Sequence, residues 1–140
     1  MPAIDPQGYW MPVCEIVRRP RCWLRLAWVD GAETNMSRWD QGLGMPIDRY
    51  LEGPDGPLPI RHVMWVQVMP VLVRGGLAGR PLEFVEMQDE VVASMRGTRA
   101  LWTLREEQWS VEGLFESRPG LAIHIANPFR TGRNGQGCAG

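Results

Sequence analysis

The sequence predicts a mainly β (α+β) fold, an antiparallel β-sandwich or open barrel of about six to eight strands with one helix near residues 82–96. Three observations lead to this prediction. The clearest strand pattern is over Cys22–Val29, where one face carries Cys22, Leu24, Leu26 and Trp28 and the other carries Trp23, Arg25, Ala27 and Val29. Residues 62–73 are apolar on both faces, which is typical of a strand inside a sheet. Turn-forming Gly, Pro, Asp and Asn residues separate these segments.

Length and composition indicate an ordinary globular chain. Its 140 residues are enough for one domain. We assign residues 1–129 to a single globular domain and residues 130–140 to a glycine-rich tail with few side chains to bury. The net charge is −1, and all 15 basic residues are arginine. Arginine pairs with carboxylates in a bidentate manner and stacks on aromatic rings.

The first elements are predicted to be extended. Tyr9–Val17 is predicted as a strand, and Pro12 places it at a sheet edge because proline has no N–H for a strand ladder. Residues 18–21 form a turn before the strand Cys22–Val29. Asp30-Gly31 predicts a tight hairpin with a return strand over Ala32–Met36.

The middle of the chain combines a loop with the most apolar strand. Residues 37–59 are rich in glycine and proline, and such a long loop is often functional. A short helix is predicted between Pro46 and Leu51, with Gly53 beyond its end. Residues 62–73 follow as the central strand, in which Pro70 indicates a bulge or a bend.

The segment Pro81–Gly97 has two interpretations. Proline at the start, acidic residues early and glycine after the end favour a helix, which is the interpretation we prefer. Alternatively, Leu82–Met87 is a strand that pairs back on residues 68–74, and Val91–Met95 continues it.

The last part of the chain is predicted as strands. They cover Arg99–Arg105, Trp109–Phe115 and Leu121–Ala126, the last two on the basis of apolar–polar alternation. A turn is predicted over Ser117–Gly120.

No residues form a recognisable catalytic set. His62 and His124 both stand in apolar strands without a neighbouring nucleophile, so we predict no catalytic residue. Cys14, Cys22 and Cys138 lack the paired spacing of zinc ligands or of a disulfide framework. They are predicted to be buried free thiols, although Cys14 and Cys22 would approach each other in a hairpin. We expect no metal and no cofactor, and the absence of a catalytic set argues against an enzyme.

Two short segments have a composition related to ligand-binding motifs. Gly75–Arg80 is glycine-rich but lacks the Lys-Ser/Thr ending of a phosphate-binding loop, so we interpret it as a flexible loop. Arg18–Arg21 followed by Asn35–Ser37 resembles the motif pair of PilZ domains, which bind cyclic dinucleotides. Asp40 stands where that pair ends in glycine, and the chain is therefore not assigned to the family.

Tryptophan is the main compositional signal, with seven residues. Three are expected to pack in the core, namely Trp28, Trp65 and Trp102. Three others lie beside loops or on a more polar face and are expected to be exposed at a binding surface, namely Trp10, Trp23 and Trp39. Exposed tryptophan is common in interaction hot spots and on ligand-stacking surfaces.

The leading functional hypothesis is a non-enzymatic protein-interaction or assembly domain, for example an accessory or structural protein of a phage particle. Its partner would be another protein or a second copy of the chain. The sequence has neither a signal peptide nor an apolar run of ~20 residues that could span a membrane. We therefore expect an intracellular or virion-associated protein.

Two other hypotheses stay open. A carbohydrate-binding module or compact barrel enzyme would use the 37–59 loop, with Trp39, Asp40, Arg49 and His62 around one pocket. A single-stranded nucleic-acid binder would instead gather arginines with Trp23 on one face, namely Arg18, Arg19, Arg21 and Arg25. The near-zero net charge argues against nucleic acid.

Overall fold

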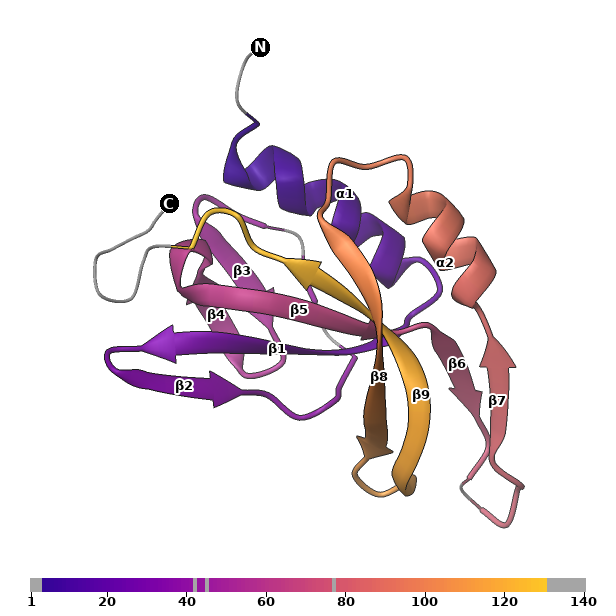
Figure 1. Cartoon of the computed structure of the whole chain (residues 1–140). Helices are drawn as coiled ribbons and strands as arrows, with labels where there is room; N and C mark the ends of the chain where they lie inside the picture. Colours follow the sequence, from indigo (N-terminus) through magenta and orange to yellow (C-terminus); the bar gives the residue numbers. More distant parts are fainter. Residues whose placement is uncertain (1–3, 42, 45, 77, 131–140) are drawn as a thin grey trace.

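The computed structural model describes residues 4–41, 43–44, 46–76 and 78–130, so Cys138 and the tail beyond Arg130 lie outside the described residues. The elements follow one another along the chain as drawn in Figure 1. They are α1 (Pro6–Arg18), β1 (Trp23–Asp30), β2 (Glu33–Met36), β3 (Tyr50–Gly53), β4 (Gly56–Pro59), the 3-10 turn η1 (Ile60–His62), β5 (Val63–Met69), β6 (Val71–Arg74), β7 (Glu83–Glu86), α2 (Gln88–Met95), β8 (Trp102–Val111) and β9 (Phe115–Ala126).

A curled antiparallel sheet organises the fold. Its strand order is β2-β1-β5-β9-β8, so β5 is central, as predicted for this part of residues 62–73. The predicted strand divides at Pro70, and residues 71–74 form β6 in a separate sheet with β7. Arg25 on β1 lies 3.0 Å from Glu107 on β8 although two strands separate β1 from β8. Neighbouring strands are about 4.8 Å apart, so this contact requires strong curvature. The sheet is a half-barrel, which confirms the mainly β fold of open-barrel type. We call the face that carries Arg25 and Glu107 the concave face.

Each face of the sheet has its own apolar cluster. The larger cluster joins the opposite face to α1 and α2, which lie together on that side (Figure 1). The smaller cluster lies on the concave side near the β6–β7 hairpin and consists of Trp39, Met69, Val71, Trp109, Val111 and Ala122.

The strand predicted over residues 9–17 is wrong, because this segment is the helix α1. Asp5 caps the helix by accepting the Gly8 N–H at 2.8 Å, and Pro6 occupies the first turn. The apolar residues follow helical spacing, so that one face is buried, namely Tyr9, Trp10, Val13, Cys14 and Val17. An interior proline costs a helix about 3 kcal/mol. The burial of this face outweighs that cost at Pro12.

Tyr9 attaches α1 to the edge of the sheet. Ala126 N–H donates to the Leu101 carbonyl at 2.9 Å, just before β8 begins. The Tyr9 hydroxyl donates to the Ala126 carbonyl at 2.7 Å and accepts the Leu101 N–H at 2.9 Å. In a regular antiparallel pair, the Leu101 N–H would donate directly to the Ala126 carbonyl. Here the Tyr9 hydroxyl bridges these two groups.

The short helix predicted over residues 46–51 is also wrong. Ile47 and Tyr50 exchange two backbone hydrogen bonds of 3.1 and 3.0 Å across a tight turn, and Asp48 in this turn has a φ of +61°. A left-handed residue cannot continue a helix. The chain then forms the β3–β4 hairpin, so the loop predicted over 37–59 contains two strands.

The segment 81–97 contains parts of both interpretations. Residues Glu83–Glu86 form β7, which pairs with β6 as in the strand alternative. The favoured helix starts only after Met87, where Asp89 and Glu90 lie in the first turn of α2. Because residues 83–86 pair with β6, the helix is shorter than predicted at its N-terminal end.

The turn predicted over residues 117–120 lies inside strand β9. The chain reverses earlier, at Glu112–Leu114, where Gly113 has a φ of +85°. Gly120 has a different role, because the indole of Trp109 lies where a Cβ would be, 2.4 Å from the nearest ring atom. The predicted strand Leu121–Ala126 is confirmed as the end of β9.

Several shorter predictions are confirmed. Asp30-Gly31 begins a hairpin whose return strand is β2, and the described residues 75–76 and 78–79 belong to the connection between β6 and β7. Cys14 and Cys22 are buried free thiols. Within the described ranges, no helix has both the length and the apolar character needed to cross a membrane.

Candidate functional site

Two of the three tryptophans predicted to be exposed are buried. Trp10 is 0% exposed, and its indole N–H donates to Asn127 Oδ1 at 3.4 Å. Trp39 is 4% exposed and donates to the Gln108 carbonyl at 3.3 Å. Trp23 is half-buried beside the concave-face cluster. The expected exposure of Trp10 and Trp39 is wrong because each indole has an acceptor inside the protein.

The tryptophans predicted in the core are only half-buried. Trp28 and Trp102 pack against the larger apolar cluster. Trp65 lies on the concave face, where its ring centroid is 5.3 Å from that of His124. The burial of each tryptophan depends on where its ring lies relative to the curled sheet. The local sequence does not specify this position.

The other predicted site residues do not surround one cavity. Asp40 exchanges backbone hydrogen bonds of 2.7 and 2.8 Å with Leu24. Arg49 lines a separate cavity of about 510 Å³ near the start of α1, and His62 ends η1. Since Trp39 is buried elsewhere, the predicted site of Trp39, Asp40, Arg49 and His62 is not formed.

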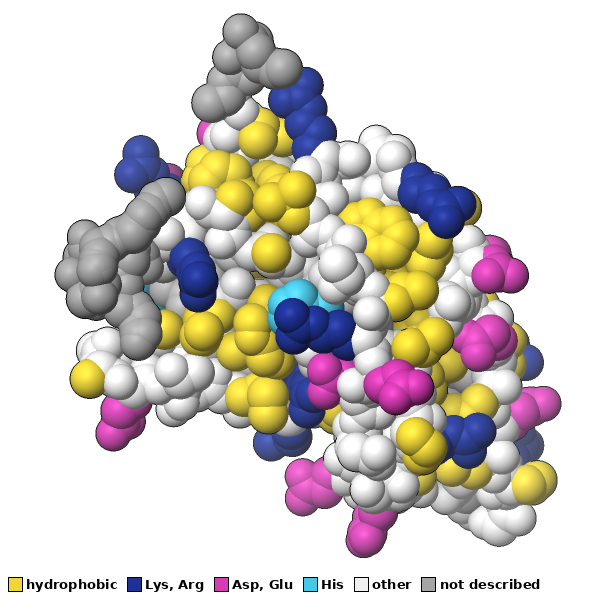
Figure 2. Space-filling model, viewed as in Figure 1, with side chains coloured by type: hydrophobic (Ala, Val, Ile, Leu, Met, Phe, Trp, Pro, Cys, Tyr) yellow, Lys and Arg dark blue, Asp and Glu magenta, His cyan; other side chains and the backbone are white. Residues whose placement is uncertain are grey.

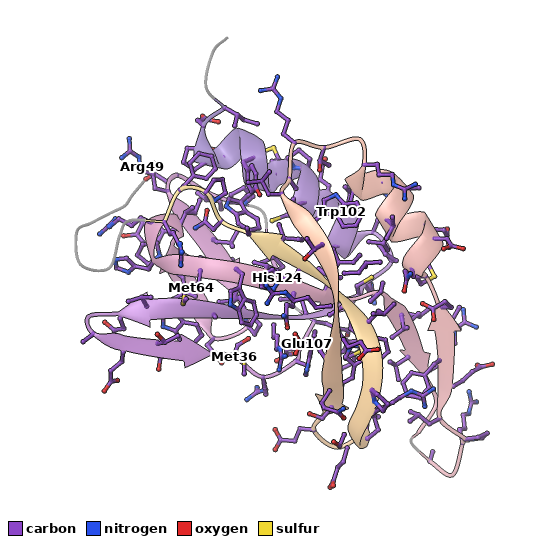
Figure 3. All side chains as sticks on the ribbon, in the orientation of Figure 1. Met36, Arg49, Met64, Trp102, Glu107 and His124 are labelled. Carbon is purple, nitrogen blue, oxygen red and sulfur yellow. The ribbon has the colours of Figure 1, made fainter. Side chains whose placement is uncertain are left out.

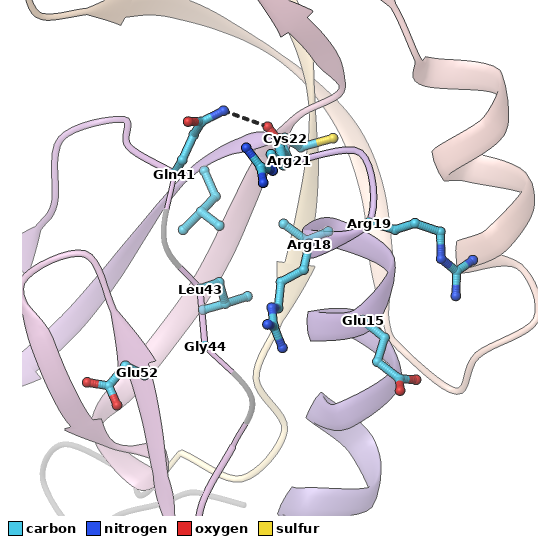
Figure 4. A pocket seen from close by; sticks show the side chains of 11 residues that line it. Glu15, Arg18, Arg19, Arg21, Cys22, Gln41, Leu43, Gly44 and Glu52 are labelled. Atoms are coloured by element: carbon cyan, nitrogen blue, oxygen red, sulfur yellow. Dashed lines mark hydrogen bonds between the residues drawn. The ribbon is translucent and has the colours of Figure 1, made fainter.

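A cavity of about 930 Å³ lies where α1 ends (Figure 4). Its floor consists of buried apolar side chains, namely Val17, Cys22, Leu24 and Leu43. Its rim is polar and charged, with Arg18, Arg21, Gln41 and Glu52, and Glu15 and Arg19 adjoin it from the end of α1. We call this space the α1 cavity. Because the floor side chains are at most 2% exposed, the groups that a ligand can reach are mainly those of the rim.

Local backbone structure sets the rim on the helix side. Cys22 N–H donates to the Val17 carbonyl at 3.2 Å and Arg21 N–H donates to the Arg18 carbonyl at 3.1 Å. These two bonds define a Schellman motif at the end of α1. Arg21 takes the left-handed position, with a φ of +58°. Glycine usually occupies this position, because a side chain there costs about 1 kcal/mol.

The opposite wall begins at Gln41. The backbone pair between Leu24 and Asp40 attaches this wall to β1. Gln41 Nε2 donates to the carbonyl of Arg21 at 2.8 Å, the bond drawn as a dashed line in Figure 4. This hydrogen bond connects the wall at Gln41 to the helix side of the cavity at Arg21, the residue with the left-handed backbone.

Arginine dominates the charge around the opening. Figure 4 shows the Arg18 and Arg21 side chains on the side of α1 that faces Leu43, whereas Glu15 and Arg19 point to the other side of the helix. Among the described residues, neither Arg18 nor Arg21 forms an ion pair. Their guanidinium groups are therefore available to an anion.

The α1 cavity lacks a nucleophile. Burial raises the pKa of the Cys22 thiol to about 12, so the thiol stays protonated at neutral pH. The histidines do not line this cavity. The arrangement can bind a ligand, with arginine for an anionic group and for a flat ring stacked on a guanidinium plane.

Arg25 does not join the other arginines. It lies on the concave face, where its guanidinium carbon is 4.5 Å from the centre of the Trp39 ring and Nη2 is 3.0 Å from Glu107 Oε1. Arg18 and Arg21 lie at the end of α1 instead. The single face of four arginines expected for a nucleic-acid binder is not formed.

Sequence reasoning missed the α1 cavity although one signal was present. The Arg18–Arg21 cluster precedes the apolar strand β1 and marks the rim. Leu43, Gly44 and Glu52 join it only through the fold. A strand over residues 9–17 makes this cluster a turn, whereas the helix α1 makes it a helix end.

Comparisons with known proteins find no family model, no curated protein and no solved structure that matches this chain. In the described ranges, no group of three or more His, Cys, Asp or Glu side chains could hold a metal ion. The evidence for the candidate site is therefore its geometry.

Proposed function

We propose that this chain is a binding domain for a small organic anion held in the α1 cavity. The observation that carries the proposal is Arg21, which lies at a glycine position of the Schellman motif. Backbone strain of this kind is concentrated at functional sites. A role in binding gives a reason for arginine at a position where glycine would be more stable.

The cavity indicates the chemical class of the ligand. Its volume of about 930 Å³ is within the usual range for small-ligand sites. Guanidinium groups bind phosphate and carboxylate through paired hydrogen bonds. The floor residues are at most 2% exposed, so the ligand skeleton would contact the rim, where guanidinium planes stack on aromatic rings. We therefore expect a phosphate monoester or a carboxylate with a flat aromatic body.

Naphthyl phosphate is a suitable probe, and naphthol is its uncharged counterpart. Calorimetric titration of the full chain should detect naphthyl phosphate but not naphthol. Arg21→Gly should weaken binding about tenfold, because a charge-assisted hydrogen bond is lost. The same substitution should raise the thermal stability, because glycine relieves the left-handed strain.

Ala78→Gly is the matched control. Ala78 also has a left-handed backbone, with a φ of +53°, but does not line the α1 cavity. The control should raise stability without changing the affinity. Equal affinity of Arg21→Gly and the unaltered chain, or equal binding of naphthol, would contradict the proposal.

A second candidate function is self-association through the edge of β8. Ala126 N–H donates to the Leu101 carbonyl, so odd-numbered residues of β8 direct their backbone groups to β9. The backbone groups of Trp102, Leu104 and Glu106 then face the open edge. Leu101 and Leu104 are 57% and 39% exposed. An open, partly apolar edge can accept another strand.

A second copy of the chain fits this edge. If the β8 strands of two copies pair antiparallel about Leu104, the Leu104 side chains of the two copies lie opposite each other. In this register no two like charges are paired. Light scattering after size exclusion should then give the mass of a dimer, and Leu104→Lys should give a monomer. Leu121→Lys, at a 38% exposed position on the paired strand β9, should leave the dimer intact. A monomeric unaltered chain would exclude self-association.

A further inference from the structure

Three strands carry the same apolar–polar–apolar triplet. The triplets are Leu24-Arg25-Leu26, Val66-Gln67-Val68 and Ile123-His124-Ile125. The strand registers place Arg25 beside Gln67 and Gln67 beside His124. A row of polar side chains therefore crosses β1, β5 and β9 on the concave face, while the apolar neighbours enter the core.

Hydrogen bonds fix the side chain of Gln67 in one orientation. Arg25 Nε donates to Gln67 Oε1 at 2.9 Å, and Gln67 Nε2 donates to Glu107 Oε2 at 3.0 Å. Arg25 Nη2 also donates to Glu107 Oε1 at 3.0 Å. Gln67 is only 2% exposed. Reversing its amide would lose both of its charge-assisted hydrogen bonds.

This orientation determines the tautomer of His124. Gln67 Nε2 lies 3.1 Å from His124 Nδ1, and an amide nitrogen can only donate, so Nδ1 accepts. The neutral imidazole then carries its proton on Nε2. Burial and the charge of Arg105 lower the pKa of His124 below its ordinary value of 6.5, against the opposite effect of Glu107. The ring is neutral at neutral pH.

The Nε2–H of His124 is accessible from outside. In the described residues, the buried side-chain nitrogen and oxygen atoms without a partner are the indole nitrogens of Trp23 and Trp109, so His124 Nε2 is not among them. Figure 2 shows a histidine side chain reaching the surface in the middle of this face, where Figure 3 labels His124.

A cavity of about 480 Å³ adjoins this imidazole. Arg105 and Thr103 contribute polar groups from β8, and Leu101 and Ala126 contribute apolar surface. Arg105 is exposed and forms no ion pair among the described residues. Arg25 and Glu107 neutralise each other nearby, which leaves the positive charge of Arg105 beside the Nε2–H donor.

We infer that His124 and Arg105 form a carboxylate-binding site on the concave face, separate from the α1 cavity. One carboxylate oxygen accepts the His124 Nε2–H, and the guanidinium of Arg105 binds the other. Leu101 and Ala126 contact the apolar part of the ligand. Gln67 is a positioning residue, because it keeps the proton on Nε2.

Nuclear magnetic resonance of the imidazoles tests this inference directly. The chain has two histidines, so His62→Gln assigns the signals of His124. Long-range proton–nitrogen spectra at neutral pH should show the Nε2–H tautomer of His124. Benzoate should shift the His124 signals in a saturable manner, whereas its neutral isostere benzamide should not.

Substitutions distinguish benzoate binding at this site from a general effect of charge or folding. Arg105→Gln should weaken benzoate binding about tenfold or more, and Arg96→Gln, which removes an exposed arginine elsewhere, should not change it. Gln67→Leu should convert the single tautomer of His124 into a mixture. The inference is overturned if His124 is protonated on Nδ1, if benzamide acts like benzoate, or if Arg105→Gln binds benzoate normally.

Discussion

The two faces of the central strands differ in chemistry although they come from the same segments. Toward α1, six aliphatic side chains are at most 1% exposed, namely Leu24, Leu26, Val66, Val68, Ile123 and Ile125. On the concave face, the residues between them are Arg25, Gln67 and His124. Because successive side chains alternate across a strand, neighbours in sequence belong to different environments.

One sheet can therefore separate the residues that stabilise the fold from those that bind a ligand. The aliphatic face contributes burial of apolar area, which has no directional requirement. The concave face contributes hydrogen bonds whose donors and acceptors fix one another. Substitutions on the first face should change the free energy of unfolding, and those on the second should also change a tautomer or a binding constant.

Leu26→Ala should have the largest effect on stability. Leu26 is 0% exposed, and its Cδ2 lies 2.9 Å from the position that a Cβ on Gly53 would take. Truncation of such a side chain removes apolar burial and leaves a cavity, which costs about 3–4 kcal/mol. Urea unfolding followed by tryptophan fluorescence measures this loss.

His124→Gln is the comparison on the other face. It should lower the free energy of unfolding much less than Leu26→Ala, because His124 is only partly buried. It should nevertheless abolish benzoate binding, which Leu26→Ala should leave intact wherever the protein is folded. Similar destabilisation by the two substitutions would show that the faces are not separable.

The faces also differ in what could be predicted from sequence. The alternation over Cys22–Val29 correctly assigns Leu24 and Leu26 to one face and Arg25 to the other. Alternation does not say which strand lies beside β1 or in what register. The row of Arg25, Gln67 and His124 joins residues far apart in the chain, so it became visible only with the fold.

Local signals misled the prediction at the ends of elements. Pro12 favours an edge strand, but the spacing of Tyr9, Val13 and Val17 fits a helix. The rim of the α1 cavity was missed for the same reason. Ser117–Gly120 has the composition of a turn, yet the close contact between Gly120 and Trp109 keeps this segment in β9.

The smallest expected effect is a pH dependence of stability that comes from the concave face. The folded-state pKa of His124 is below the ordinary value of 6.5, first because of burial and then because of Arg105. Above that value the ring is neutral in both the folded and the unfolded chain, so it contributes no pH dependence. As the pH falls through 6.5 toward the folded pKa, the unfolded chain takes up a proton more readily, and stability is lost.

Urea unfolding at a series of pH values, compared between the unaltered chain and His124→Gln, isolates this contribution because His62 is present in both. The unaltered chain should lose stability relative to the variant below the ordinary histidine pKa and run parallel to it above. Benzoate should reduce this loss, because a carboxylate beside the imidazole stabilises the protonated ring and raises the folded pKa. A difference that does not change with pH would mean that the concave face leaves His124 as readily protonated as in the unfolded chain, and the contrast between the two faces would then be one of packing alone.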